Sequence, residues 1–388
     1  MKIIEVNDSA SKKEFLKLPV RLYKNDPNWI RPLDADIESV FDPSKNKNFR
    51  HGECARWILA GPDGKTIGRV AAFVNRKTAN KDNDQPTGGM GFFECINDRQ
   101  AAFMLFDQCK KWLSERGMEA MDGPINFGDR DRWWGLLVDG FTEPNYCTPY
   151  NPPYYKDLFE AYGFQVYFKQ YTYARKVRDG LNPKINEKAE RIKKDPNYSF
   201  RHIEKKHLAK YAEDFRYVYN KAWAKHLGVR EMPKEQAMII MKQLKPVLDE
   251  RIIWFGYYLD EPIAFYINLP ELNQLFKHVN GKLDLIGKIK FLWHKRFHPV
   301  RKMFGVSFGV IPEFQGKGVE AALIDAISTF TWSENSPYED LEMNWIGDFN
   351  PKMMHVCESV GGRINKTHIT YRKLFDETKP FKRMPMIK

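Results

Sequence analysis

Each half of the chain carries the same succession of apolar and polar stretches. In the first half, apolar runs at 55–61 and 66–76 flank the turn sequence Pro-Asp-Gly-Lys, a pattern that predicts a β-hairpin. Alternating strand-like and helix-like stretches are then predicted at 91–95, 99–117, 119–127, 154–164 and 166–177. The first half is therefore expected to read hairpin, strand, helix, strand, helix, strand.

The second half repeats this order. Its hairpin is predicted at 251–259 and 262–269, and the later strands and helices at 303–311, 318–332, 340–347, 351–362 and 368–375. The repeat predicts an α/β (α+β) chain of two related domains. A polar, charged stretch with Pro183 and Pro196 separates the halves and is expected to be a partly helical linker. We place the first domain at 1–178, the linker at 179–197 and the second domain at 198–388.

Composition excludes several classes of protein. Of the 388 residues, 43% are hydrophobic and 14% aromatic, as in globular rather than disordered chains. No apolar run approaches the roughly 18 to 20 residues of a membrane span, and the first residues lack the apolar core of a signal peptide. The five cysteines are scattered and form no C-x-x-C pair, which predicts reduced thiols and no metal site. These features predict a cytoplasmic protein.

The formal net charge of +12 favours an anionic partner, such as nucleic acid, an anionic lipid surface or a small polyanion. No nucleic-acid-binding module is recognised, so we expect no DNA partner. Residues 271–302 hold eight Lys or Arg against Glu271 and Asp284, a net charge of +6. They also hold Leu, Ile, Phe and Trp at near-helical spacing. Three interpretations stay open: an amphipathic helix on an anionic membrane, a lid over an apolar substrate, or a solvated basic helix.

A glycine-rich turn at 309–321 lies between an apolar strand and an alanine-rich helix. It is not a Walker loop, because Gly309 lies too far before Gly316, and Gly318 follows the lysine. The pattern from Gly316 to Ala321 fits a dinucleotide loop, but too few residues follow it for the parallel sheet of that fold. Glycines here would let a pyrophosphate reach backbone N–H groups at the positive end of the helix. The alternative is a turn that uses its glycines for geometry alone.

These residues resemble the GCN5-related N-acetyltransferase (GNAT) superfamily. Its loop motif, Q/R-x-x-G-x-G/A, is matched at 315–320, and its later Asn…Tyr-Glu motif at Asn350 and Cys357-Glu358. The first half repeats only the later motif, from Asn151, and has no glycine where the loop belongs. The resemblance implies two tandem GNAT-like domains, each with a mixed, mostly antiparallel central sheet flanked by helices. It also implies that the second domain binds acyl-CoA and the first does not.

The resemblance assigns acyl-CoA as a co-substrate and implies no permanently bound cofactor. The residues that it implies for acyl-CoA binding are Val310, Ile311, Gln315, Gly316, Lys317, Gly318, Val319, Ala321 and Asn350. One departure from the family is Glu320, which stands where Gly or Ala is expected. Its carboxylate either points outward from the first helical turn, where acids are favoured, or repels the pyrophosphate. Asn350 is explained nearly as well as a plain helix N-cap.

Three residues are candidates for proton transfer. In the family a tyrosine stands at the position of Cys357 and protonates the leaving thiolate. A thiol with an ordinary pKa of about 8.5 could do the same, and a buried, inert cysteine is the alternative. Glu342 and Asp348 are candidate bases on the strand before Asn350, and they share one face if that strand is regular. Water as the base, with both acids facing solvent, is the alternative to these two.

The resemblance implies an acyl-CoA-dependent N-acyltransferase that moves an acyl group from a CoA thioester to an amine. Residues 133–141 and 149–164 also resemble a bacterial branch with members associated with acylating long-chain amino lipids, so the acceptor is a small amine or an amino lipid. One alternative is a catalytically degenerate protein that binds acyl-CoA or a lipid without turnover. Another is aminoacyl or peptidyl transfer from a tRNA-linked donor. A lipid acceptor would place the protein at the inner face of the membrane.

Overall fold

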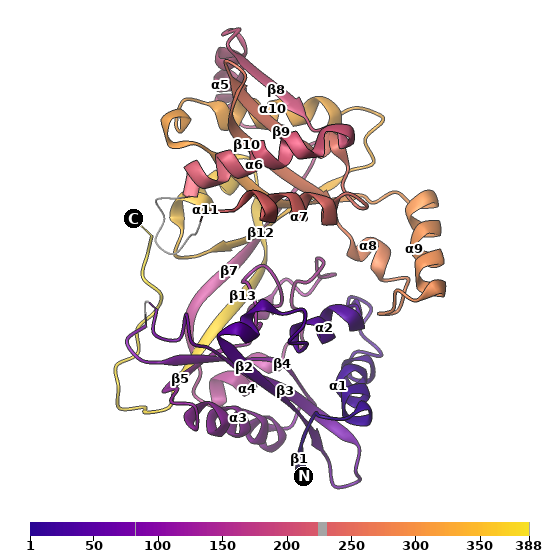
Figure 1. The fold of residues 1–388 in the computed structure, drawn as a ribbon, viewed down its shortest axis with the longest axis vertical. Helices are drawn as coiled ribbons and strands as arrows, with labels where there is room; N and C mark the ends of the chain where they lie inside the picture. The colour runs from indigo at the N-terminus through magenta and orange to yellow at the C-terminus, as the bar shows by residue number, and fades with distance from the viewer. Residues whose placement is uncertain (82, 224–230, 388) are drawn as a thin grey trace.

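The strands of the two halves join edge to edge in one continuous sheet. The computed structural model describes residues 1–81, 83–223 and 231–387. Within them, thirteen strands form a sheet of order β1-β2-β3-β4-β5-β13-β7-β12-β11-β10-β9-β8, with β6 paired to β13. Figure 1 shows the N-terminal half below and the C-terminal half above, with β7 and β13 running between them. The sheet is mixed, mostly antiparallel and flanked by helices, which confirms the predicted fold class.

The N-terminal half begins with a strand and two helices before its predicted hairpin. Its elements are β1 (Lys2–Glu5), α1 (Ser9–Leu22), α2 (Asp34–Val40), a 3-10 turn (Lys47–Arg50), β2 (Gly52–Ala60), β3 (Thr66–Asn75), β4 (Thr87–Cys95), α3 (Arg99–Ser114), β5 (Ala120–Gly123), β6 (Leu136–Asp139), α4 (Tyr155–Ala161) and β7 (Gln165–Lys176). The segment predicted as a linker contains α5 (Pro183–Lys193). The hairpin and the later strands and helices lie where the sequence patterns predict them.

The C-terminal half has the same order with larger additions. Its elements are β8 (Tyr198–His202), a 3-10 turn (Lys205–His207), α6 (Leu208–Trp223), α7 (Lys234–Leu244), a 3-10 turn (Glu250–Ile252), β9 (Ile253–Tyr258), β10 (Glu261–Pro270), α8 (Asn273–Phe276), α9 (Leu285–Phe297), β11 (Lys302–Val310), a 3-10 turn (Pro312–Phe314), α10 (Val319–Thr331), β12 (Asp340–Gly347), α11 (Pro351–Ser359) and β13 (Arg363–Leu374). The basic stretch 271–302 forms α8 and α9, between β10 and β11.

The two halves exchange their last strands. β13 ends the C-terminal half but pairs antiparallel with β5 of the N-terminal half, with Tyr371 opposite Gly123. β7 ends the N-terminal half but pairs antiparallel with β12 of the C-terminal half, with Lys176 opposite Asp340. β7 and β13 pair with each other at the centre of the sheet. Each half is therefore completed by a strand that the other half supplies (Figure 1).

Local signals in the sequence explain how the elements start and turn. Asp284 begins α9 because its side chain accepts a hydrogen bond from the Gly287 N–H at 2.9 Å, which satisfies one of the unpaired amides of the first turn. β9 and β10 are joined by Leu259 and Asp260, which both have positive φ, 49° and 62°. Two such residues in succession are typical of the tight type I′ hairpin turn.

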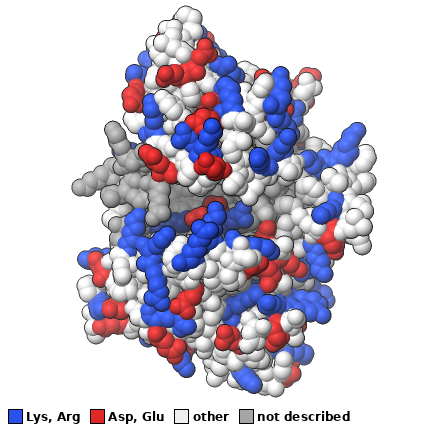
Figure 2. Space-filling model, in the orientation of Figure 1, with Lys and Arg blue, Asp and Glu red and all other residues white. Residues whose placement is uncertain are grey.

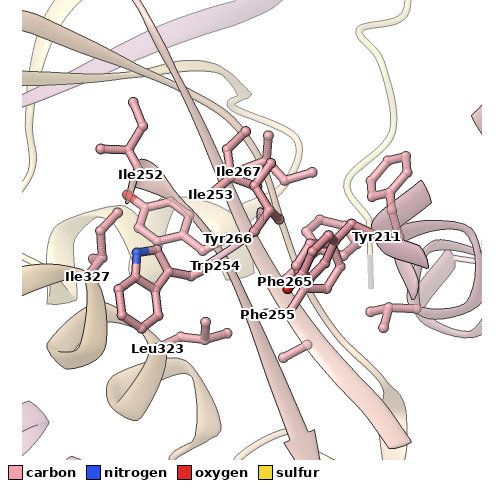
Figure 3. Close-up of a cluster of buried hydrophobic side chains, with 14 of the residues drawn as sticks. Tyr211, Ile252, Ile253, Trp254, Phe255, Phe265, Tyr266, Ile267, Leu323 and Ile327 are labelled. Carbon is pink, nitrogen blue, oxygen red and sulfur yellow. The ribbon is translucent and has the colours of Figure 1, made fainter. Parts of the chain in front are cut away.

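Each half has its own hydrophobic core against the sheet. In the C-terminal half, Phe255 and Phe265 are fully buried on the face covered by α6. Trp254 and Tyr266, their neighbours along the strands, turn to the opposite face, where α10 contributes Ile327 (Figure 3). This alternation is the period of two that a strand buried on both faces requires. The core thus holds α10, and the loop that precedes it, in a defined position against the sheet.

Candidate active site

β11 and β12 run parallel at their starts and then separate. Their pairing begins with Lys302 opposite Asp340 and ends with Gly305 opposite Met343. A cavity of about 410 Å³ lies beyond this point, between the separated strands. Its wall comes from β7, β10, β11, α10, β12, α11, the chain after β7 and Arg130 of the N-terminal half, and is largely apolar, with Arg130 and Arg175 as its basic residues. Apolar contributors include Leu181, Val306, Ile324, Ile346, Met353 and Val360. The separation of two parallel strands thus creates a slot that extends from the middle of the sheet.

The predicted glycine loop connects β11 to α10 beside this cavity. Gly316 has φ +71° and Gly318, the N-cap of α10, has φ +102°, so both use the left-handed region that favours glycine. Because Gly318 has no side chain, the first N–H groups of α10 donate no hydrogen bond to an N-cap side chain. Gln315 fixes the loop by donating from Nε2 to the Val310 carbonyl at 2.9 Å. This geometry suits an anion nest.

The linker helix α5 packs against the same loop and adds positive charge. Arg191 donates from Nη2 to the Lys317 carbonyl oxygen at 2.8 Å. A Cβ atom on Gly318 would lie 3.2 Å from the Cβ of Lys188, so the absence of a side chain at Gly318 allows this close packing. Three basic side chains therefore surround the loop. Glu320, the departure from the family pattern, is half-buried on the first turn of α10, and its Oε2 accepts no hydrogen bond from a described residue.

The other residues implied for acyl-CoA binding take part in strand pairing, in the hydrophobic core or in helix capping. The Ile311 N–H donates to the Ile263 carbonyl at 2.9 Å, so it belongs to the pairing with β10. Val319 and Ala321 are buried in the cores beneath α10. Asn350 caps α11, with its Oδ1 accepting from the Met353 N–H at 3.2 Å, and it lines the cavity as well. Asn350 is therefore the N-cap of α11, as one of its two interpretations predicts, and its role in acyl-CoA binding stays a prediction.

Cys357 lies on α11 in the wall of the cavity and is almost fully buried. Burial, with a smaller contribution from the neighbouring Glu358 charge, raises the pKa of its thiol to about 12. A CoA thiolate, with a pKa near that of an ordinary thiol at about 8.5, is a much weaker base than the Cys357 thiolate. Protonation of the leaving group by Cys357 would therefore be unfavourable, and this geometry favours a structural role.

Glu342 lies in a buried polar cluster across the two halves. Its Oε1 and Oε2 accept hydrogen bonds from Lys366 Nζ at 3.2 and 3.0 Å, and Lys302 Nζ donates to Oε1 at 3.0 Å. Asn145, from the N-terminal half, donates to Oε2 at 2.7 Å. Burial alone would raise the pKa of Glu342, but the two lysine charges lower it. A carboxylate bound in this way is a poor proton acceptor.

Asp348 is separated from this cluster by an irregularity in β12. The pairing of β12 with β7 shifts register between Met343 and Ile346, which ends the simple alternation of side chains along the strand. Asp348 forms an ion pair with Arg383 of the C-terminal segment. The three candidates for proton transfer, Cys357, Glu342 and Asp348, thus have different partners and do not converge on one point.

Asn344 was not singled out by the sequence reasoning but occupies a central position. It lines the cavity at the end of the β11–β12 pairing. Its Oδ1 accepts from the Thr172 hydroxyl at 2.8 Å, and its Nδ2 donates to the Thr148 hydroxyl oxygen at 3.0 Å. The available signal was the alternation of Glu342 and Asn344 with apolar residues in a short strand. Polar residues at alternate positions of an otherwise apolar, central strand indicate a buried polar face.

In the N-terminal half the equivalent slot is closed. β4 and β5 are parallel from Thr87 to Gly89, and the chain after β5 stays beside β4, with the Ile125 N–H donating to the Met90 carbonyl at 2.8 Å. At the start of α3, Asp98 takes the place that Gly318 has in α10, and its Oδ1 accepts from the Ala101 N–H at 2.7 Å. A carboxylate therefore already occupies the position where a phosphate would bind.

Comparison with curated proteins gives relatives along nearly the whole chain, whereas no family model matches it. Bacterial ceramide synthase of Caulobacter vibrioides (strain NA1000 / CB15N) is 27% identical over 378 residues, covering 96% of this chain and 97% of that protein. Protein YghO of Escherichia coli (strain K12) is 26% identical over 375 residues, covering 93% of this chain and 92% of that protein.

Comparison with solved structures identifies the fold. A tandem GNAT protein from the clavulanic acid biosynthesis pathway, determined without acetyl-CoA, matches with a TM-score of 0.55. The two proteins are 11% identical, and the match covers 98% of this chain and 99% of that one. This chain has the fold of a tandem GNAT protein, as its repeated pattern and its two motifs predict.

Proposed function

We propose that this protein is an acyl-CoA-dependent N-acyltransferase whose acceptor is the amine of a long-chain amino lipid. The observation that carries the proposal is the separation of β11 from β12 beside a glycine loop, in a tandem GNAT fold. The name of the C. vibrioides relative supports it, because a ceramide is the N-acylated form of a long-chain amino alcohol.

The C-terminal half supplies the site for the acyl donor. In our proposal the loop around Gly316 and the start of α10 bind the pyrophosphate of CoA, and Lys188, Arg191 and Lys317 add positive charge. The largely apolar cavity then receives the pantetheine arm and the acyl chain, since its wall offers few groups that need water. The N-terminal half has no such donor site, because its slot is closed and its helix start carries Asp98.

The reaction forms a C–N bond and breaks the C–S bond of the thioester. The amine nitrogen attacks the carbonyl carbon and loses a proton, and CoA leaves as a thiolate that takes up a proton. Because Glu342 and Asp348 are both in ion pairs, we propose that water accepts the proton of the amine. A water chain can perform this role when no side chain is available.

The position of α9 supports a lipid acceptor. α9 protrudes from one side of the molecule (Figure 1) and exposes a stripe of large apolar residues. Their exposed fractions are 75% for Leu285, 65% for Ile286, 60% for Ile289, 62% for Leu292, 51% for Trp293 and 60% for Phe297. Phe291, which the sequence pattern groups with them, instead faces inward and stacks on Phe276, with ring centroids 5.4 Å apart. We call the six exposed residues the α9 stripe.

Basic residues border the α9 stripe. At about 100° per residue, the stripe spans roughly 140° of the helix surface, and Lys288 and Lys290 lie just outside its two edges. Arg296 lies within the same arc, near the C-terminal end of the helix. Neither lysine forms an ion pair within the described part of the chain. Figure 2 shows this edge of the molecule as mostly uncharged surface with basic side chains beside it. No described helix is long and apolar enough to cross a membrane. We propose that α9 lies in the surface of an anionic membrane, at its cytoplasmic face.

The donor site is tested by a charge change at Gly316. A Cβ atom at this position would meet nothing within 4 Å, so a side chain fits there. Asn and Asp both tolerate positive φ and have the same shape, which makes G316N the matched control for G316D. We expect calorimetric titration to show CoA binding to wild type and G316N, and at least tenfold weaker binding to G316D. Equal affinity of the two variants would refute the assignment of the loop.

The acyl-transfer step is tested by thiol release from a long-chain acyl-CoA in the presence of amines. We expect release with sphinganine, a long-chain amino diol, and formation of the corresponding amide by mass spectrometry. If the protein binds acyl-CoA but releases no CoA thiol with any of the amines tested, it is a binding protein and the transferase proposal is refuted. This outcome is favoured if Glu320 and the absence of a tyrosine at position 357 have removed activity.

A further inference from the structure

A second cavity lies in the N-terminal half, beside the end of β4 and the chain that follows β5. It has a volume of about 110 Å³. Its wall contains the aromatic rings of Trp29, Phe92, Trp133 and Tyr150. Three acidic residues, Asp34, Asp36 and Glu94, also line it. We call it the acceptor cavity.

Among the described residues, three acidic and two basic ones line the acceptor cavity. Arg31 pairs with both oxygens of Asp34, at 2.9 and 2.8 Å. Arg69 lies 3.5 Å from Glu94 and is buried, with its Nε lacking a partner among the described residues. Asp36 accepts a hydrogen bond from the neutral Tyr146 hydroxyl at 2.6 Å, and the Arg132 charge acts on it from beyond ion-pair distance. The lining therefore contains one more acid than base, and Asp36 is the acid without an ion pair among the described residues.

Backbone strain is concentrated in the wall of this cavity. Six non-glycine residues of the described chain have positive φ, and three of them line it: Phe92 at 50°, Trp133 at 43° and Cys147 at 60°. Such conformations cost on the order of 1 kcal/mol or more for side chains of this size and are typical of functional sites.

The acceptor cavity lies next to the cavity of about 410 Å³ between β11 and β12, which we call the donor cavity. One hydrogen bond joins the walls of the two cavities. Thr148 lines the acceptor cavity and Asn344 lines the donor cavity, and the two side chains are hydrogen-bonded at 3.0 Å. A group held in the acceptor cavity is therefore separated from the end of the β11–β12 pairing by these two side chains.

The acceptor cavity also adjoins the base of α9. Tyr146 lines the cavity and contacts Phe276, with ring centroids 5.1 Å apart, and Phe276 stacks on Phe291 of α9. Leu33, on the other wall, belongs to the same apolar cluster as Phe276. A continuous apolar cluster thus joins α9 to the wall of the cavity. The volume has room for at least about four groups the size of a water molecule, enough for a polar headgroup but not for a lipid chain.

We propose that the acceptor cavity binds the amine-bearing headgroup of the acceptor, while its hydrocarbon chain extends along Leu33, Phe276 and Phe291 toward the membrane. This inference rests on the proposed function. Aromatic faces and an unpaired carboxylate together favour a primary ammonium group on entry. The amine becomes the nucleophile after water accepts the proton of the ammonium group, as proposed for the transfer step. Each half of the chain then binds one of the two substrates.

The test compares two Asp→Asn changes that differ only in location. D36N removes the charge in the cavity but keeps an oxygen for the Tyr146 hydroxyl. D107N makes the same change in α3, where Asp107 accepts from the Tyr162 hydroxyl at 2.6 Å on the protein surface. We expect D36N to raise the KM for sphinganine at least tenfold, with CoA affinity unchanged, and D107N to alter neither.

A direct binding measurement accompanies the kinetics. Wild type should retain sphinganine in equilibrium dialysis better than N-acetylsphinganine, which has the same chain but no amine, and D36N should lose this preference. If D36N does not fold, W29L carries the same test, because Trp29 lines the cavity without an ionic partner. If amide forms but D36N matches D107N, the acceptor cavity is assigned wrongly and the proposed function stands. If no amide forms with any amine, the proposed function itself fails.

Discussion

The exposure of the α9 stripe allows the membrane proposal to be tested without disturbing the fold. Leu285, Ile289 and Leu292 are 75%, 60% and 62% exposed, so replacing all three by Gln removes little internal packing, and Gln keeps a good helix propensity. Burying a fully exposed Leu or Ile side chain contributes about 1.5–3 kcal/mol. Scaled by the exposed fractions, each residue can contribute about 1–2 kcal/mol on insertion, and the three together at least about 3 kcal/mol.

We therefore expect the triple variant to bind anionic vesicles about 100-fold more weakly than wild type, since 1.4 kcal/mol corresponds to a factor of ten. Cosedimentation with vesicles that contain phosphatidylglycerol measures this at low salt. Wild-type binding should weaken as salt is raised, because each basic residue near the surface contributes roughly 1 kcal/mol that screening removes. I239Q is the control, since Ile239 is 50% exposed on α7 and does not belong to the α9 stripe.

Two results would refute this reasoning. If wild type does not bind anionic vesicles at low salt, α9 is not a membrane contact, and the lipid acceptor loses its support from charge and shape. If the triple variant binds anionic vesicles as tightly as wild type, the lysines alone account for vesicle binding and the α9 stripe does not insert into the membrane.

Three further predictions concern buried groups. Burial raises the pKa of Glu271 to about 7 from 4.5, so the folded state keeps a proton that the unfolded chain releases. Wild type should therefore lose about 3 kcal/mol of unfolding free energy relative to E271Q as pH rises from 4.5 to 8, and parallel pH profiles in urea unfolding would contradict this. E342Q should lose about 3–5 kcal/mol, because it leaves Lys302 and Lys366 as buried charges without a counter-ion. Adding K366M to E342Q should recover part of that loss, whereas an additive effect of the two changes would show that Glu342 and Lys366 are not coupled. C357A should retain acyl transfer within about threefold, because burial raises the pKa of this thiol and makes it a poor proton donor. A hundredfold loss of kcat at unchanged stability would instead make Cys357 catalytic.

The local parts of the fold were predictable because their signals lie within a few residues. The apolar runs beside Pro-Asp-Gly-Lys identify the hairpin of β2 and β3, and the glycines at 316 and 318 identify the turn between β11 and α10. Asn350 followed by proline identifies the start of α11. The additional helices α1, α6 and α7 were not predicted, although Asp8 before α1 accepts hydrogen bonds from the Ala10 and Ser11 N–H groups and is a recognisable N-cap.

The parts that depend on distant residues were not predictable from local patterns. Glu342 is a plausible base when only β12 is considered. Its partners are 24 and 40 residues away in the same half, and Asn145 lies 197 residues away in the other half. Glu342 is buried because the two halves pack together around it. The pattern of polar and apolar residues along β12 does not predict this contact. The closing of the slot at Met90 and Ile125 depends on packing in the same way.

The exchange of β7 and β13 makes the chain a single cooperative unit despite its two repeats. If residues 1–178 were expressed alone, β5 would lose its partner β13 and have an unpaired edge. If residues 179–388 were expressed alone, β12 would lose its partner β7 and also have an unpaired edge. Unpaired strand edges lead to pairing between molecules. A nick between β7 and α5 should therefore leave two fragments that stay associated and unfold together. The arrangement is what a homodimer with swapped terminal strands would become if its two subunits were fused end to end. After such a fusion one copy could specialise in the donor while the other changed its sequence, with both still required for either to fold.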